Sequence, residues 1–145
     1  MARFQERTDL PTIDSASAPY WEAARQGHLL IAGCVACGKV HHYPRPFCPF
    51  CWSEDVRPVR ASGTATLYTY STVHVNDLAP FKERLPYVAA IVELDEGPRL
   101  MTTIEGADPE HLWVGMPVTA VFRAIDDADP DSPYLTVFTP SEESP

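Results

Sequence analysis

The chain has 145 residues, of which 45% are hydrophobic, and a formal net charge of −9 at pH 7. This length suits one ordinary domain or two small ones and excludes a large multidomain enzyme, while the negative charge argues against nonspecific nucleic-acid binding. The fifteen prolines favour turns and extended segments over long helices, so we expect a mainly β fold.

Residues 1–16 are predicted to form a flexible, polar N-terminal arm. The start of this arm lacks the apolar centre of a secretory signal peptide, and no apolar run in the chain approaches the roughly 20 residues of a membrane span. We therefore expect a cytoplasmic protein, in which paired cysteines bind metal more often than they form disulfides.

The first regular element is predicted as a short helix over residues 17–27. Ser17 is expected to cap its first turn, and Gly27 to end it. Tyr20 and Trp21 give the helix an apolar face, which should dock on the rest of the chain or on a partner.

The strongest motif consists of two C-x-x-C pairs that contain all four cysteines of the chain and are separated by ten residues. The pairs are formed by Cys34, Cys37, Cys48 and Cys51. Two such turns can close a tetrahedron around one ion, so residues 17–60 are predicted to comprise the helix and a zinc ribbon. The alternatives are two disulfides, a redox dithiol at Cys48 and Cys51, or unrelated buried thiols. Iron also remains open, although zinc is favoured because it is redox-inert and suits four thiolates.

His41 and His42 lie between the cysteine pairs. We assign them no ligand role, because four thiolates already complete a tetrahedral site.

From residue 61 to residue 140 the pattern changes to strands separated by proline, glycine and aspartate. Five strands are predicted, at residues 64–75, 87–94, 99–104, 117–125 and 134–138. Gly97 should supply the positive φ of a hairpin turn, and Asp108 should cap a short helical turn before the fourth strand. This order suits a five-stranded barrel of the OB type, followed by a disordered tail at residues 141–145.

The first of these strands carries a row of residues that a period of two would place on one face of the barrel. The row consists of Thr66, Tyr68, Tyr70, Thr72 and His74. Such a row could stack nucleobases, or it could belong to the core or to an interface. A single-stranded nucleic-acid-binding protein is therefore kept as an alternative function.

Motifs for a self-contained active site are lacking. The sequence contains no G-x-S-x-G elbow, glycine-rich phosphate loop or H-E-x-x-H helix, and the predicted metal cage uses every thiol. We expect no catalytic residues in this chain.

Taken together, an ordered series of motifs between Pro19 and Pro140 resembles one known family, the acyl-CoA-associated proteins that join a rubredoxin-like zinc ribbon to an OB-fold. The motifs are the Tyr20-Trp21 helix, the two cysteine pairs with Pro44-Arg45-Pro46 between them, Gly63, Pro86-Tyr87-Val88, Leu94 to Leu100, and Gly115 to Val118.

The resemblance implies a non-catalytic accessory subunit of a thiolase-superfamily complex, such as a thiolase or a lipid-transfer-protein-like aldolase. Such a subunit would form a hetero-oligomer, hold one structural zinc and help to form or cover the channel for an acyl-CoA thioester. Tyr20 and Trp21 are then the expected partner-binding residues. Arg45, Lys82, Arg84 and Arg99 are candidates for contact with CoA phosphates, with surface salt bridges as the alternative.

A third function class stays open beside the accessory subunit and the nucleic-acid binder. An iron-loaded cage would make the protein a rubredoxin-like electron carrier.

Overall fold

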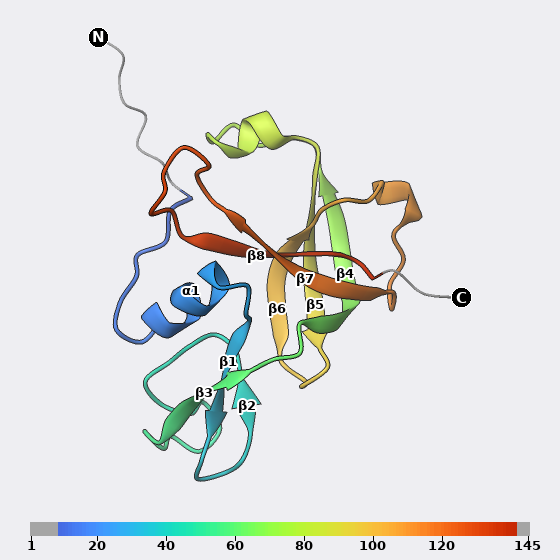
Figure 1. The fold of residues 1–145 in the computed structure, drawn as a ribbon. Helices are drawn as coiled ribbons and strands as arrows, with labels where there is room; N and C mark the ends of the chain where they lie inside the picture. The colour runs from blue at the N-terminus through green and yellow to red at the C-terminus, as the bar shows by residue number, and fades with distance from the viewer. Residues whose placement is uncertain (1–8, 142–145) are drawn as a thin grey trace.

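The structure is a computed structural model that describes residues 9–141, so residues 1–8 of the predicted arm and 142–145 of the predicted tail lie outside the described residues. It is mainly β, with one α-helix, a small three-stranded sheet and a closed five-stranded barrel (Figure 1). The elements are α1 (Ala18–Arg25), β1 (Leu30–Cys34), β2 (Val40–His41), β3 (Val56–Arg60), β4 (Thr64–Val73), η1 (Phe81–Arg84), β5 (Tyr87–Leu94), β6 (Arg99–Ile104), η2 (Pro109–His111), β7 (Pro117–Ala124) and β8 (Tyr134–Pro140). Within the described part of the chain, no helix is long and apolar enough to cross a membrane.

The two ends of α1 are stabilised in different ways. The prediction that Ser17 caps the helix is wrong, because its side chain makes no cap hydrogen bond. Asp14 makes the capping hydrogen bond instead, one turn earlier. Its Oδ1 accepts from the Ser17 N–H at 2.8 Å, and its own N–H donates to Ser17 Oγ at 3.1 Å. This reciprocal pair resembles a capping box. At the other end Gly27 adopts a φ of 82°, as the sequence predicts, and the His28 N–H donates to the Ala23 carbonyl.

The ribbon sheet has the order β2-β1-β3 and is antiparallel throughout. Strand β3 was not predicted, and its central residue, Pro58, lacks an N–H. In an antiparallel pair of strands, hydrogen-bonded residue pairs alternate with non-hydrogen-bonded ones. The Ala61 N–H donates to the Leu29 carbonyl and the Val35 N–H to the Asp55 carbonyl, which fixes this alternation along β1 and β3. Pro58 falls at a position between these pairs, where an N–H would point away from β1. Proline is therefore tolerated here because β3 is an edge strand.

The barrel confirms the five predicted strands, with small differences at their ends. Its order is β4-β5-β6-β8-β7, and it closes through the pairing of β7 with β4. Neighbours are antiparallel except β6 and β8, which meet in parallel where Ile104 pairs with Phe138. The Glu105 N–H donates to the Phe138 carbonyl at 2.9 Å and extends this junction. This is the Greek-key arrangement of an OB-fold.

The predicted one-faced row on the first barrel strand is wrong. The register between β4 and β5 shifts between Leu67 and Thr69, which marks a bulge. A bulge inserts one residue and reverses the inward and outward alternation beyond it. Tyr68 therefore remains 45% exposed, whereas Tyr70 packs against the core and donates its hydroxyl to the Leu112 carbonyl at 2.8 Å. The bulge thus separates the two tyrosines that were expected to stack bases.

The ribbon and the barrel share one hydrophobic cluster. Leu29 and Ile31, at the start of the ribbon, belong to the same buried cluster as Leu67, Val118 and Phe138 of the barrel. In Figure 1, α1 lies beside β1 at the junction of the two modules. The position of the ribbon relative to the barrel is therefore fixed by apolar packing.

Candidate metal centre and cavities

The four cysteine thiols converge at the end of the ribbon sheet. All four Sγ atoms lie within 4.8 Å of one another, with Cys34 and Cys51 at 3.5 Å and Cys37 and Cys48 at 3.7 Å. Four sulfurs placed tetrahedrally at the usual Zn–S distance would be about 3.8 Å apart. The thiols are therefore spaced to hold one zinc ion, and they are too far apart for disulfides, whose S–S bond is about 2.05 Å.

The two cysteine turns have the same backbone geometry. In the first, the Cys34 carbonyl accepts from the Gly38 N–H at 2.8 Å, and the Cys34 N–H donates to the Lys39 carbonyl at 2.9 Å. In the second, Cys48 makes the same two bonds with Trp52 and Ser53, at 2.9 and 2.8 Å. This repetition presents both pairs of thiols in the same way, which is the expected design of a zinc ribbon.

Backbone donors favour the thiolate form of Cys48. Its side chain is fully buried, which by itself raises the pKa of a thiol. Hydrogen bonds from the N–H groups of Phe50 and Cys51 and from the neighbouring thiols outweigh burial and lower the pKa of Cys48 to about 7. A thiolate at neutral pH is the form that binds metal.

The histidines beside the cage do not join it. Among the described residues, the four cysteines form the only group of three or more metal-binding side chains close enough to hold an ion. His41 is 4% exposed, and neither ring nitrogen of His41 or His42 has a hydrogen-bond partner in the described structure. Burial, together with the neighbouring His41, lowers the pKa of His42 to about 4. Both rings therefore serve as neutral packing groups.

The apolar face of α1 packs mainly within the chain. Tyr20 packs against the shared core, and its hydroxyl shares a hydrogen bond of 3.0 Å with Thr136 Oγ1 of β8. Trp21 lies edge-on to Tyr20 at a ring-centroid distance of 5.1 Å and remains partly exposed. Only Trp21 thus offers a sizeable free surface from the predicted pair.

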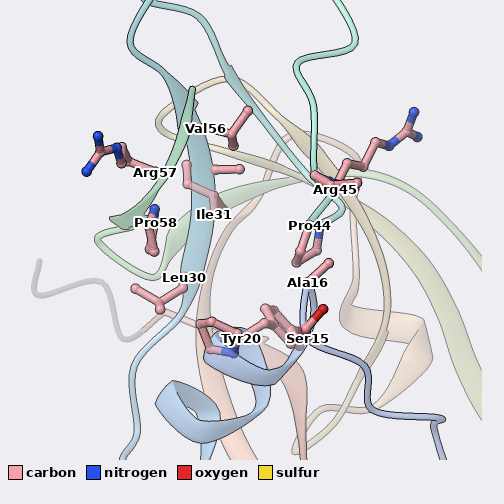
Figure 2. Close-up of a pocket in the computed structure, with 13 residues that line it drawn as sticks. Ser15, Ala16, Tyr20, Leu30, Ile31, Pro44, Arg45, Val56, Arg57 and Pro58 are labelled. Atoms are coloured by element: carbon pink, nitrogen blue, oxygen red, sulfur yellow. The ribbon is translucent and has the colours of Figure 1, made fainter. Parts of the chain in front are cut away.

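The four candidate cations do not converge on one site. Arg45 lines a cavity of about 330 Å³ between the start of α1 and the ribbon sheet. Figure 2 shows that the guanidinium groups of Arg45 and Arg57 point outward on opposite sides of this cavity. Its interior is largely apolar, with Tyr20, Leu30 and Ile31 among the lining residues.

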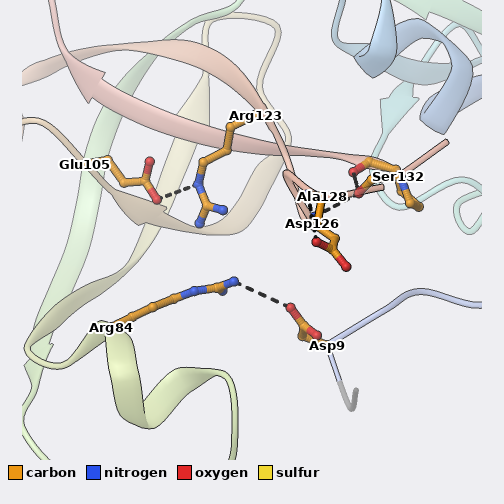
Figure 3. A network of polar contacts seen from close by, with 8 residues as sticks. Asp9, Arg84, Glu105, Arg123, Asp126, Ala128 and Ser132 are labelled. Atoms are coloured by element: carbon orange, nitrogen blue, oxygen red, sulfur yellow. Dashed lines mark hydrogen bonds and ion pairs between the residues drawn. The ribbon is translucent and has the colours of Figure 1, made fainter. Parts of the chain in front are cut away.

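The other three cations belong to the barrel. Arg84 lines a second cavity, of about 540 Å³, together with Arg123, a residue that the sequence did not single out. Figure 3 shows the two arginines with their ion-pair partners, Asp9 and Glu105. Lys82 is exposed on η1. Arg99 is paired with Glu93 at 3.0 Å and lies over the Tyr68 ring at 3.8 Å from its centroid, so a surface ion pair accounts for it.

The cysteine cage and the barrel define a two-module protein, a zinc ribbon followed by an OB-fold barrel. Residues 21–57 match the family model described as the rubredoxin-like zinc ribbon domain of ChsH2, and residues 58–123 match the model of the C-terminal OB-fold domain of ChsH2. The chain belongs to this family, whose members also carry the name DUF35.

Relatives of two lengths match the chain. It is 39% identical over 120 residues to a DUF35 domain-containing scaffold protein of Methanocaldococcus jannaschii, covering 80% of this chain and 82% of the relative. It is 40% identical over 136 residues to a probable enoyl-CoA hydratase alpha subunit of Thermomonospora curvata, covering 92% of this chain. The match spans only 41% of that longer relative.

A solved structure also matches over nearly the whole chain. One chain of the structure titled Ltp2-ChsH2(DUF35) aldolase is 41% identical, with a TM-score of 0.77. The match covers 90% of this chain and 98% of that one. It therefore includes both the ribbon and the barrel.

Proposed function

We propose that this chain is a non-catalytic accessory subunit of a thiolase-superfamily complex, a thiolase or a lipid-transfer-protein-like aldolase, that acts on acyl-CoA thioesters. The observation that carries the proposal is the 41% identical match to 98% of one chain of the Ltp2-ChsH2 aldolase. In that structure the matched unit is part of an aldolase.

The thiols of the chain support this assignment. Thiolase chemistry needs a free cysteine nucleophile, and here the metal cage uses all four. The reacting groups would then belong to the partner, while the zinc has a structural role. Free thiols gathered in a cage also suit the reducing cytoplasm, where we place the protein.

The contribution of the subunit would be to position the substrate. A barrel face that covers part of the CoA channel would hold the thioester and exclude water from it. CoA would then be shared between the two proteins, and the exposed part of the α1 face at Trp21 would contact the partner.

A hydratase is the second candidate partner. Two relatives are named as alpha subunits of hydratases, and the chain covers 41% and 37% of their lengths. In these proteins the ribbon and barrel belong to a longer polypeptide. The same module could thus serve hydratase chemistry.

Purification of the tagged protein from its native cell extract, with identification of the bound chains, tests the proposal. Recovery of a thiolase-superfamily protein in stable stoichiometric amounts is the expected result. Recovery of a hydratase would favour the second candidate, and a protein that stays alone would contradict both.

A further inference from the structure

We propose that the 540 Å³ cavity lined by Arg84 and Arg123 binds the phosphorylated nucleotide end of CoA. The inference deepens the proposed function and rests on it for the choice of CoA among nucleotides. Figure 3 shows the polar groups around Arg84 and Arg123.

The cavity lies where an OB-fold usually binds its ligands. Its lining comes from the loop between β4 and β5, the start of β5, the end of β6 and the following turn, together with β7 and β8. The second and third barrel strands and the loop before them form the common ligand face of this fold. The volume falls within the usual range for small-ligand sites.

Two guanidinium groups line this one cavity in a protein of net charge −9. Arg123 donates from Nε to Glu105 at 2.8 Å, and in the described structure its two Nη groups have no hydrogen-bond partner. Arg84 lies 3.7 Å from Asp9, which is an ion-pair distance but too long for a hydrogen bond. Both arginines therefore keep N–H donors that a phosphate could accept in the fork geometry that guanidinium prefers.

The rest of the lining suits a ring attached to those phosphates. Phe81 and Tyr87 both line this cavity, with ring centroids 6.4 Å apart, and the Arg84 guanidinium lies over the Phe81 ring at 5.9 Å from its centroid. The Tyr87 hydroxyl accepts from Asn76 Nδ2 at 3.1 Å, which ties this ring to the loop before β5. Thr103 also lines the cavity, and its buried Oγ1 has no partner among the described residues. Aromatic faces beside arginines are the usual means of binding a nucleotide base and its phosphates.

The size and charge of the site favour a single nucleotide over a nucleic-acid strand. A strand would need a cationic groove along several phosphates, and the net charge of −9 opposes such binding. The bulge after Leu67 also separates Tyr68 from Tyr70 and so removes the aromatic row. CoA supplies one nucleotide with three phosphates, and its pantetheine arm would extend toward the partner.

The test is an NMR titration of the full chain, labelled with ¹⁵N, with CoA up to about 5 mM, a range that reports millimolar dissociation constants. CoA and ADP are expected to shift the amide signals of Arg84, Tyr87 and Thr103, whereas pantetheine leaves them unchanged. Arg84→Met and Arg123→Met should each weaken CoA binding by roughly tenfold or more, because each removes charge-assisted hydrogen bonds.

Arg99→Met is the matched control, because it removes the same charge from the barrel outside the cavity and should change CoA affinity less than about twofold. The inference is overturned if CoA shifts none of the cavity signals, if pantetheine shifts them as much as CoA does, or if oligothymidylate binds more tightly. A protein that co-purifies with a thiolase but gives no cavity shifts overturns this inference alone. Cavity shifts without any thiolase partner would support the site and contradict the proposed function.

Discussion

Gly38 and Trp52 occupy equivalent positions in the two cysteine turns. Each comes directly after the second cysteine of its pair, and each donates its N–H to the carbonyl of the first cysteine. Both have a positive φ, 75° at Gly38 and 66° at Trp52. Trp52 is the only non-glycine residue with a positive φ in the described chain, and its ring stacks on Phe47 at 5.4 Å.

This relationship predicts different effects on stability for two substitutions. Gly38→Ala should destabilise the ribbon by about 1 kcal/mol, because the left-handed conformation is unfavourable for a residue with a Cβ. A Cβ at Gly38 would meet no atom within 4 Å, so the cost is purely conformational. Trp52→Gly should be close to neutral, because relief of about 1 kcal/mol of backbone strain offsets the lost ring contact.

Chemical unfolding of the zinc-loaded protein, followed by circular dichroism, compares the two variants. A Trp52→Gly variant destabilised by much more than Gly38→Ala would contradict the equivalence. It would show that the Phe47–Trp52 stack, rather than the backbone, dominates the second turn.

The cage predicts one zinc per chain. Cys34→Ser or Cys48→Ser should lower zinc content and loosen the ribbon, because a hydroxyl is a poor replacement for a thiolate ligand. The barrel should retain its fold, although Leu29 and Ile31 join the ribbon to its core, so some loss of stability should reach it. Elemental analysis and thermal unfolding measure the two effects. Purified protein that contains iron with reversible redox, or no metal, would contradict the zinc assignment.

His42 predicts a loss of stability in mild acid. Its pKa in the folded protein is lowered to about 4, whereas an unfolded histidine titrates near 6.5. Between these two pH values the unfolded chain binds a proton at His42 and the folded chain does not. The contribution of neutral His42 to the free energy of unfolding is therefore complete above pH 6.5 and is lost as the pH falls toward 4. It amounts to at most about 3 kcal/mol.

Replacement of His42 by Phe should flatten this pH dependence. Unfolding midpoints of the two proteins between pH 5 and 7, with zinc content measured in parallel, provide the test. Equal slopes for both proteins, with zinc retained, would show that His42 does not titrate in this way.

Tyr20 and Trp21 are predicted to differ in role although they are adjacent. Tyr20→Phe should cost about 1 kcal/mol of stability, because it removes the hydrogen bond to Thr136. Trp21→Ala should mainly weaken binding to the partner, since Trp21 is partly exposed and large aromatic residues often dominate interfaces. Thermal unfolding and titration calorimetry with the purified partner separate the effects. Unchanged affinity of the Trp21→Ala variant would place the interface elsewhere.

The sequence predicted the barrel strands well because each is a run of β-forming residues between proline, glycine or aspartate. It missed β3, whose Pro58 is compatible with a strand only at an edge, and edges are not visible in a sequence. It also missed the bulge after Leu67, because the shift depends on pairing with β5.

The metal site was predictable from the sequence, whereas the arginine-lined cavity was not. The ligands of the cage lie in two local turns, so their spacing along the chain reveals them. Arg84 and Arg123 come from separate elements and meet only after the barrel closes. No local pattern distinguishes Arg123 from other strand cations, so only Arg84 could be chosen in advance.

The most direct test of the account measures the thioester turnover of the purified partner with and without this chain, and that of the chain alone. Because the cage uses every thiol, the isolated chain should turn over no acyl-CoA. Its addition should raise the kcat/KM of the partner or keep the partner soluble. Substantial turnover by the isolated chain, or a partner that is equally active and soluble without it, would contradict the accessory-subunit function.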